Sequence, residues 1–455
     1  MSALSKDHLS WFGIIRLGLV QTSLGAIVVL MTTTLNRIMV VELALLATIP
    51  GILVALHYTV QLTRPRWGYG ADVGGRRTPW IIRGIGILAI AGVLAAFGTW
   101  VMESSFVWGF VVSVLAFALV GTGAGMAGTN LLALLAIQTA PRRRPAAASI
   151  VWMMMIAGFA VTAGTVGALI DPFSFERLLL VTTAVSIIGF VVTVLAVFGL
   201  EKSVERSEKS EEKKLSGSGF IQAFKEIWAE DKARQFTVFI FISMLAYSAQ
   251  DLILEPFAGL VFNYTPGEST KLGGLMHAGV LVGMALVAIV GTAYGKGRFG
   301  SMRFWAVSGC LIAAVAFVSL TLGAFAGPGW PLDENVFLLG FGSGAFAVAA
   351  IGSMMGLASE GRSQREGTRM GLWGASQAIA FGIGVFLGAV AVDLMRLVFE
   401  TNTQAYAAVF ALEAVLFVWS ALIAYKVSPE GALSNLNHKP SDSQIIAEQA
   451  GFKGV

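Results

Sequence analysis

The chain has 455 residues, of which 56% are hydrophobic and 13% are charged, and its formal net charge is +4. Soluble domains are about 45–50% apolar and about 25% charged, so this composition excludes an ordinary soluble protein. The apolar residues come in runs long enough to span a membrane, so the positive net charge does not indicate a nucleic-acid-binding protein. The single cysteine, Cys310, lies in an apolar run and excludes a disulfide scaffold. We expect no cleavable signal peptide, since the polar segment 1–10 precedes a run long enough to span a bilayer.

Twelve apolar runs predict an all-α membrane protein with twelve transmembrane helices, because a bilayer core of about 30 Å requires roughly 20 apolar residues per helix. The first six helices are expected at 12–34, 42–62, 80–101, 107–136, 149–170 and 177–200. The second six are expected at 236–260, 273–294, 303–326, 335–358, 370–392 and 405–426. The runs are too long, and lack the alternation, for strands of a membrane barrel.

The placement of Lys and Arg predicts that both termini are cytoplasmic. With a cytoplasmic N-terminus, 26 of the 31 basic residues fall in cytoplasmic segments. Four fall on the other side (Arg37, Arg177, Lys271 and Arg396), and Arg16 lies within the first span. Since cytoplasmic loops carry the excess of Lys and Arg, this distribution fixes the expected orientation.

A charged segment containing Ser and Gly divides the chain into two six-helix halves. The expected divisions are an N-terminal half at 1–200, a cytoplasmic linker at 201–235, a C-terminal half at 236–426 and a cytoplasmic tail at 427–455. Trp152 and Gly167 of the fifth span recur as Trp373 and Gly388 of the eleventh, each 221 positions later. Two six-helix halves related by an axis along the membrane normal predict the major facilitator superfamily fold.

Glycines of the fourth and tenth spans also recur. Gly121, Gly123 and Gly125 of the first half match Gly340, Gly342 and Gly344 of the second. Small residues allow helices to approach closely in lipid, so tight helix contacts are the expected role. The alternative role is to line a path for a substrate or pigment.

The loop between the second and third spans resembles the G-x-x-x-D-x-x-G-R-R loop of major facilitator proteins. The matching residues are Gly68, Asp72, Gly75, Arg76 and Arg77. The resemblance implies a conformational loop that latches the two halves in an outward-facing state. The sequence departs from the pattern at Val73, where a basic residue is common, and the copy at 295–300 lacks the acid. The alternative is a basic loop at the membrane surface.

Polar and ionisable residues within apolar spans are functional candidates, because they are costly in lipid. They are Arg16, Glu42, His57, Asn130, Asp251, Glu255, His277, Glu360 and Glu413. Asp251 and Glu255 are four positions apart, which places them on one face of a helix beside Gln250. Pro256 is expected to loosen that helix.

Histidine suggests a second kind of site, because neutral imidazole can bind the magnesium of a chlorophyll. His57 lies toward the expected cytoplasmic end of its span and His277 toward the opposite end of its own. The two are therefore separate candidates and not a pair. Packing with a hydrogen bond is the simpler interpretation of each.

The sequence lacks the motifs of the enzyme classes considered. It has no Gly-rich phosphate loop with Lys and Ser or Thr, no His-Glu-x-x-His zinc pair and no Cys–His pair. It also lacks the Asp-rich pattern with which membrane prenyltransferases hold diphosphate. We therefore expect a protein that is not an enzyme and has no metal site of its own.

Four segments together resemble the PucC/LhaA group, a branch of the major facilitator superfamily in phototrophic bacteria. They are Leu9–Leu19, Arg76–Trp80, Gly121–Ala136 and, most specifically, Gln250–Phe257. The resemblance extends over residues 9–426 and places Gln250, Asp251, Glu255 and Pro256 on the motif.

The resemblance implies a chaperone-like assembly factor for light-harvesting antenna complexes. It implies that bacteriochlorophyll is bound or delivered to the α and β polypeptides of LH1 or LH2, with a carotenoid as a second candidate pigment. Other implied partners are bacteriochlorophyll synthase or further assembly factors, in the cytoplasmic or intracytoplasmic membrane. Two alternatives remain: a proton-coupled transporter of a small lipophilic solute that uses Asp251 and Glu255, and a membrane enzyme of pigment biosynthesis.

Overall fold

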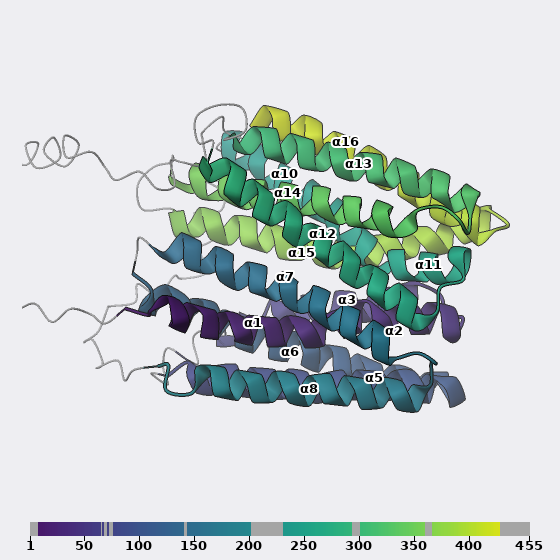
Figure 1. Cartoon of the computed structure of the whole chain (residues 1–455), viewed down its shortest axis with the longest axis horizontal. Coiled ribbons are helices and arrows are strands. Elements are labelled where there is room, and N and C mark those ends of the chain that lie inside the picture. The colour runs from purple at the N-terminus through teal and green to yellow at the C-terminus, as the bar shows by residue number, and fades with distance from the viewer. Residues whose placement is uncertain are drawn as a thin grey trace, which may run out of the picture.

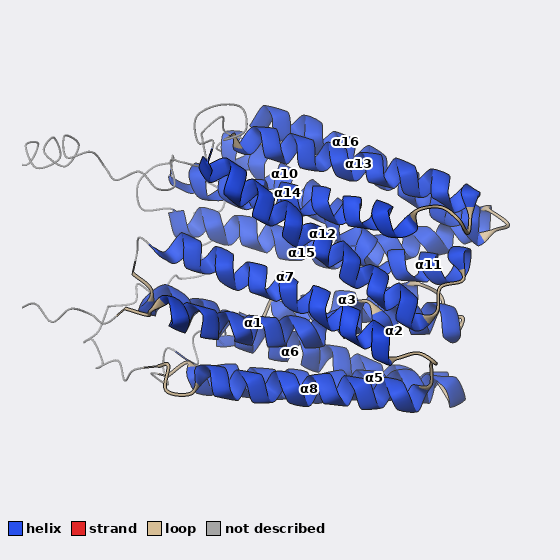
Figure 2. Ribbon diagram, in the orientation of Figure 1, coloured by secondary structure: helices blue, strands red, loops and turns tan. Residues whose placement is uncertain are grey.

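The computed structural model describes residues 8–64, 66–67, 71, 76–140, 143–201, 231–293, 301–359 and 366–427. Within these ranges, long helices lie side by side as one bundle with their axes roughly aligned (Figure 1). Short loops join their ends (Figure 2). Helical structure satisfies the backbone N–H and C=O groups within each segment, as a hydrocarbon environment requires.

Residues 8–201 form α1 (Trp11–Thr32), α2 (Thr34–Arg37), the π-helix η1 (Ile38–Glu42), α3 (Thr48–Gln61), α5 (Thr78–Ser104), α6 (Phe106–Gln138), α7 (Arg144–Leu169) and α8 (Phe175–Val197). Residues 231–427 form α10 (Asp231–Ala249), the 3₁₀ turn η3 (Gln250–Leu252), α11 (Leu254–Phe262), α12 (Pro266–Ala293), α13 (Met302–Ala326), α14 (Leu332–Ser359), α15 (Glu366–Val398) and α16 (Asn402–Val427).

Nine helices of the described chain are long and apolar enough to cross a membrane. A bent helix pair raises this number to ten if it counts as one span. Its first member is α10 with η3, and its second member is α11. These helices confirm a multi-pass membrane protein. The expected second span, 42–62, is shorter in the structure because η1 ends at Glu42 and α3 has only 14 residues. Twelve spans in two halves therefore stay a prediction.

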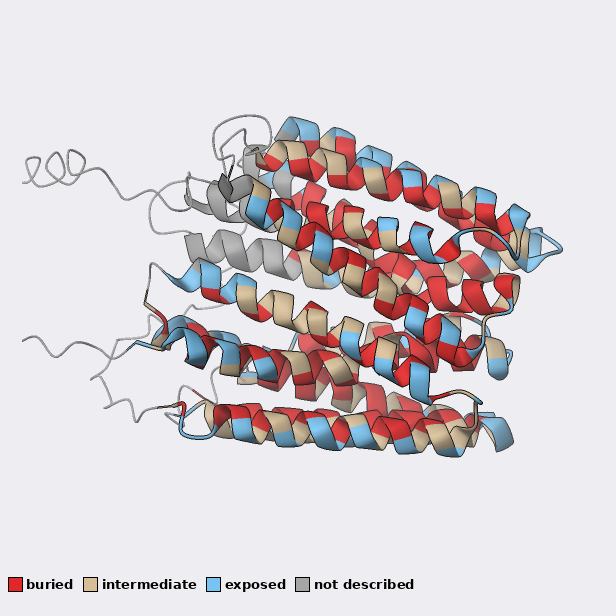
Figure 3. Cartoon of the chain, in the orientation of Figure 1, coloured by how far each residue is buried: buried red, intermediate tan, exposed pale blue. Residues whose placement is uncertain are grey.

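Buried apolar side chains form two large clusters. One cluster takes its residues from 14–200, with Leu252 and Val385 added from later in the chain. The other takes its residues from 239–424, with Val40 of η1 and Ala47, which directly precedes α3, added from earlier in the chain. Figure 3 shows the buried residues where helices face one another and exposed residues along the outer faces. Large apolar side chains on those outer faces, such as Leu195 and Val415, are suited to contact with lipid.

The close helix contacts predicted for the recurrent glycines are confirmed. A Cβ atom at Gly121 would lie 2.4 Å from the carbonyl oxygen of His57 on α3. A Cβ atom at Gly340 would lie 2.0 Å from the carbonyl oxygen of Met276 on α12. Both glycines are therefore needed for a backbone-to-backbone approach.

The next glycine of each group makes a second close contact. Gly123 of α6 lies against Gly84 of α5, where a Cβ atom would be 2.6 Å from the Gly84 carbonyl oxygen. Gly342 of α14 lies against Gly309 of α13, where a Cβ atom at Gly342 would be 2.9 Å from the Gly309 carbonyl oxygen. The repeated glycines thus pack against helices that occupy matching places in the sequence order.

Candidate binding site at the bent helix pair

The break between α10 and α11 has a cause in the sequence. Pro256 has no N–H, so the carbonyl of Leu252 lacks its helical donor. Asn36 of α2 replaces that donor, since its Nδ2 lies 2.8 Å from the Leu252 oxygen. The two helices meet at an angle of 41°. The predicted loosening at Pro256 is confirmed, whereas the partner Asn36 was missed; a lone Asn in an apolar run was the available signal.

Asp251 lies on η3 within this break and is half-buried. Its carboxylate interacts electrostatically with Tyr58 of α3 and Tyr247 of α10. The ring of Phe381 on α15 lies 5.8 Å from the Tyr58 ring and 5.7 Å from the Tyr247 ring, between centroids. Tyr58 and Tyr247 therefore lie within electrostatic range of the Asp251 carboxylate, and Phe381 of a third helix lies against both tyrosine rings.

A groove between α3 and α15 adjoins this aromatic group. Its volume is about 210 Å³. Tyr58 belongs both to the groove and to the rings beside Asp251. The groove is lined by Ala55, Tyr58, Thr59, Leu62, Ala378, Ile379, Gly382, Ile383 and Phe386.

Glu255 faces a different set of neighbours from Asp251. It is 2% exposed, and the absence of a side chain at Gly273 of α12 makes room for it, since a Cβ atom there would lie 2.5 Å from Oε1. Arg37 interacts with it electrostatically. The side chain of Thr33 also interacts with it. The 3₁₀ turn and the bend interrupt the single helical face on which the sequence placed Asp251 and Glu255 together.

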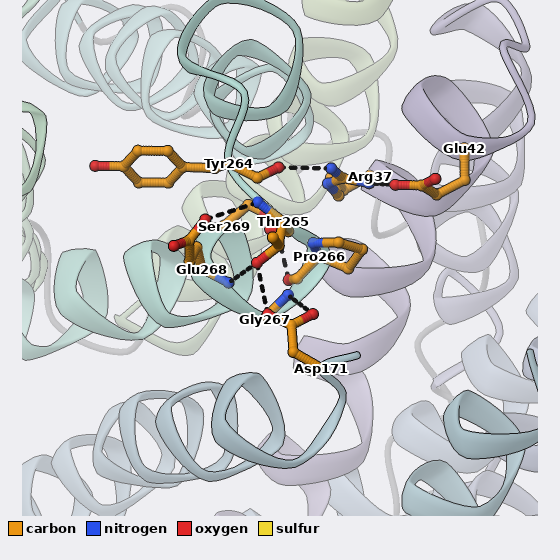
Figure 4. Close-up of polar contacts among 9 residues, drawn as sticks. All are labelled: Arg37, Glu42, Asp171, Tyr264, Thr265, Pro266, Gly267, Glu268 and Ser269. Carbon is orange, nitrogen blue, oxygen red and sulfur yellow. Dashed lines mark hydrogen bonds and ion pairs between the residues drawn. The ribbon is translucent and has the colours of Figure 1, made fainter. Parts of the chain in front are cut away.

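Arg37 connects two segments at the end of the bundle near α11 (Figure 4). Its guanidinium donates to the Glu42 carboxylate and, over 2.8 Å, to the carbonyl oxygen of Tyr264. Gly259 leaves space for this guanidinium, as a Cβ atom there would lie 3.1 Å from Nη2. Burial, and secondarily Asp333, raises the pKa of Tyr264 to about 12, so its hydroxyl stays a donor to Asp333 at neutral pH.

Gln250 adds two further polar atoms to the break. The residue is 1% exposed, and neither its amide nitrogen nor its amide oxygen has a partner among the described residues. A buried amide without partners is costly, which marks η3 as a place that can accept a ligand or undergo rearrangement.

The structure places the two candidate histidines in separate surroundings. His57 is buried on α3, where its Nδ1 lies 2.6 Å from the Val54 carbonyl oxygen and its ring lies 4.0 Å from the Tyr58 ring. His277 is buried on α12, with its ring 4.9 Å from that of Phe159 on α7. Its Nδ1 has no partner within the described part of the chain.

Only part of the candidate conformational loop lies within the described residues. Gly68, Asp72 and Gly75 lie outside them, and Arg76 is exposed. At the start of α5, the Glu201 carboxylate accepts from the backbone N–H of Arg77 at 2.7 Å and from that of Thr78 at 2.9 Å. Glu201 was not among the residues predicted from the sequence to act at this loop.

The remaining polar and ionisable candidates have mainly structural surroundings. Arg16 donates to the Ala196 carbonyl oxygen over 2.9 Å, which suits a cation at the end of α8. The amide of Asn130 donates to its own helix. Glu413 is buried on α16 with Oε2 unpaired among the described residues, and Glu360 lies outside them.

Comparison with known proteins identifies the family. The sequence profile described as "PUCC protein" matches residues 34–432. The chain belongs to the PucC family. It is 50% identical to the "Bacteriochlorophyll synthase 44.5 kDa chain" of Rhodobacter capsulatus, with 91% of this chain and 95% of that relative aligned. It is 30% identical to "Protein PucC" of the same organism, with 89% of this chain and 90% of that relative aligned.

Solved structures show that this PucC family member shares the fold of major facilitator transporters. An inward-facing bacterial homologue of the human lysosomal transporter Spinster aligns with a TM-score of 0.67 at 17% identity, covering 97% of this chain and 100% of that one. A nucleoside transporter aligns with a TM-score of 0.66 at 15% identity, covering 91% and 99%. At these identities the likeness concerns the fold alone.

Proposed function

We propose that this protein is a non-enzymatic assembly factor that binds bacteriochlorophyll and delivers it to the α and β polypeptides of light-harvesting complexes. Membership of the PucC family and the pigment named for the 50% identical relative support this proposal. Delivery needs a site that holds the pigment in the membrane and releases it unchanged, without making or breaking covalent bonds.

The observation that carries the proposal is the carboxylate of Asp251 within electrostatic range of Tyr58 and Tyr247, whose rings both lie against the ring of Phe381. Magnesium prefers oxygen ligands, and a carboxylate within a membrane span is a strong one. Aromatic rings pack favourably against a flat conjugated macrocycle. Bound bacteriochlorophyll would supply the magnesium, while Asp251 would hold it and the three rings would orient the macrocycle.

The other candidate residues supply secondary contacts in this proposal. In His57 the Nδ1 atom is engaged by Val54, which leaves Nε2 as the atom available to a ligand. In His277 it is Nδ1 that is unpaired among the described residues. Gln250 offers the unpaired amide of the bent helix pair, and Glu255 offers its buried carboxylate.

The groove beside Tyr58 fits an edge of the pigment and not the whole of it. Its volume, about 210 Å³, is below the roughly 300–1,000 Å³ of pockets that enclose a ligand. The remainder of the macrocycle and its hydrocarbon tail would lie in lipid beside α3 and α15. Partial enclosure suits a protein that must release its cargo.

The proposed architecture is twelve spans in two halves, 1–200 and 236–426, with both termini in the cytoplasm of a bacterial inner or intracytoplasmic membrane. The two hydrophobic clusters and the matching glycine contacts support it. The loop containing Gly68, Asp72, Gly75, Arg76 and Arg77 would act as a latch between the halves. The linker 201–235 and the tail 427–455 would dock partners such as bacteriochlorophyll synthase.

Titration of the purified protein in lipid nanodiscs with bacteriochlorophyll tests the proposal. We expect a shift of the pigment absorption on binding, and Asp251→Leu to weaken binding at least roughly tenfold, which corresponds to about 1.4 kcal/mol. Glu413→Gln, a change at another buried carboxylate, is the matched control and should bind like the parent. Equal affinity of Asp251→Leu and the parent would reject this site.

A proton-coupled transporter of a small lipophilic solute is the second candidate function. It is favoured by the transporter fold and by the buried carboxylate of Glu255, which is 2% exposed. This function predicts that Glu255→Gln abolishes gradient-driven uptake into vesicles. Loss of antenna assembly without any solute movement would eliminate it.

The name of the 50% identical relative suggests a third candidate function, an enzyme of pigment biosynthesis. It predicts that the purified protein alone converts a bacteriochlorophyll precursor. Our proposal predicts no conversion by the protein alone, and unchanged pigment recovered from the bound state by chromatography.

A further inference from the structure

A carboxylate of α15 completes the start of α3. Asp393 Oδ1 accepts from the backbone N–H of Ala47 at 3.1 Å, and Oδ2 accepts from the N–H and the hydroxyl of Thr48, each at 2.7 Å. α3 begins at Thr48 and has no capping hydrogen bond from its own N-cap side chain. The first N–H groups of a helix need an acceptor, and an anion there also meets the positive end of the helix dipole. Asp393 therefore caps a helix that lies more than 300 positions away in the sequence.

A carboxylate of the first half does the same for α12 (Figure 4). Asp171, which follows α7, accepts from the backbone N–H of Gly267 at 3.1 Å and from the hydroxyl of Thr265 at 2.5 Å. α12 begins at Pro266. Thr265 and Glu268 also form a local capping box, so Asp171 adds an acceptor from another part of the chain.

The two caps occupy matching places. Asp171 and Asp393 are 222 positions apart, within one of the offset that relates Gly167 to Gly388. Close packing accompanies each cap. A Cβ atom at Gly167 would lie 2.5 Å from the Gly267 carbonyl oxygen, and one at Gly51 would lie 2.8 Å from the Ala389 Cβ. Asp171 follows Gly167 by four positions, and Asp393 follows Ala389 by four positions.

Other hydrogen bonds join the same two sets of helices near α2 and α11, at the same end of the bundle (Figure 1). Arg37 donates to the Tyr264 carbonyl oxygen, and Asn36 donates to that of Leu252. The hydroxyls of Thr34 and Thr270 lie 3.2 Å apart. The capped end is therefore held by specific polar contacts as well as by apolar packing.

We propose that Asp171 and Asp393 form a reciprocal clasp, in which each half of the protein supplies one carboxylate that caps a helix of the other half and holds this end closed. Because both caps cross between the halves, they exist only while α7 lies on α12 and α3 lies on α15. Opening this end exposes both helix starts and both carboxylates together. The clasp thus couples the α7–α12 and α3–α15 interfaces in one closed-to-open transition. It keeps the bundle closed at the end where the bent helix pair lies.

Distances between spin labels in the full-length protein test the clasp. The labels are placed on cysteines introduced at Glu176 and Glu400, which are exposed at the capped end, in a Cys310→Ala background. Measurements compare the parent with Asp171→Ala, Asp393→Ala and the double variant in nanodiscs. Glu103→Ala, an exposed carboxylate at the end of α5, is the matched control.

We expect each alanine variant to raise the ratio of open to closed molecules roughly fivefold, as loss of a helix cap implies, and the double variant to raise it by about the product. Glu103→Ala should leave the ratio unchanged. A double variant with the distance distribution of the parent, or a control that opens equally, overturns the clasp. If the alanine variants are not monodisperse, the similarly sized Asp171→Leu/Asp393→Leu protein, which has no side-chain acceptor, is measured, and its failure to open overturns the clasp equally.

Discussion

The hydrogen bond from Asn36 to the Leu252 carbonyl shows how one residue compensates for another. Pro256 removes a helical donor, and a side chain from α2 supplies the replacement. A carbonyl left without a donor in an apolar environment is costly, so Asn36 and Pro256 form a thermodynamic pair.

We predict that Asn36→Leu lowers the stability of the protein by about 1–2 kcal/mol, because the Leu252 oxygen loses its donor. In the Asn36→Leu/Pro256→Ala double variant, the restored N–H at position 256 should recover part of that loss. Thermal unfolding in detergent, followed by tryptophan fluorescence, measures both effects. Strictly additive destabilisation in the double variant would contradict the pairing.

At the scale of elements, glycine contacts set the spacing between helices. The carbonyl oxygen of Val280 on α12 lies so close to Gly344 of α14 that a Cβ atom would be 2.1 Å from it. By contrast, a Cβ atom at Gly164 of α7 would meet nothing within 4 Å. The two positions offer a matched comparison in helices that lie within the membrane.

We predict that Gly344→Ala destabilises the protein by about 1–3 kcal/mol, because the added methyl group forces α12 and α14 apart. Gly164→Ala should be neutral or slightly stabilising, since alanine favours the helix and has space. The midpoint of thermal unfolding distinguishes them. Equal effects at both glycines would show that helix propensity, and not packing, determines the outcome.

Features that depend on a residue's own type could be predicted from the sequence, whereas contacts between distant helices could not. The break at Pro256 and the close contacts of Gly121 and Gly340 followed from residue type alone and are confirmed. The interaction of Asp251 with Tyr58 and the caps made by Asp171 and Asp393 could not be predicted, because they join helices distant in the chain. The shared face expected for Asp251 and Glu255 assumed an unbroken helix, which η3 interrupts.

For the whole molecule, charge placement makes a prediction about orientation. With 26 of 31 Lys and Arg residues assigned to cytoplasmic segments, we predict that a reporter fused after Leu215 is cytoplasmic. A reporter fused after Gly329, between α13 and α14, should lie on the opposite side of the membrane. Paired fusions to a cytoplasmic and a periplasmic reporter measure this. The same side for both positions would contradict the proposed topology.

Purification from pigmented membranes in mild detergent shows whether the protein carries bacteriochlorophyll to antenna polypeptides. We predict that the tagged parent retains both bacteriochlorophyll and antenna α and β polypeptides. Asp251→Leu should retain the polypeptides and lose the pigment. A monodisperse parent that carries neither pigment nor antenna polypeptides would show that the protein is not a pigment carrier for the antenna.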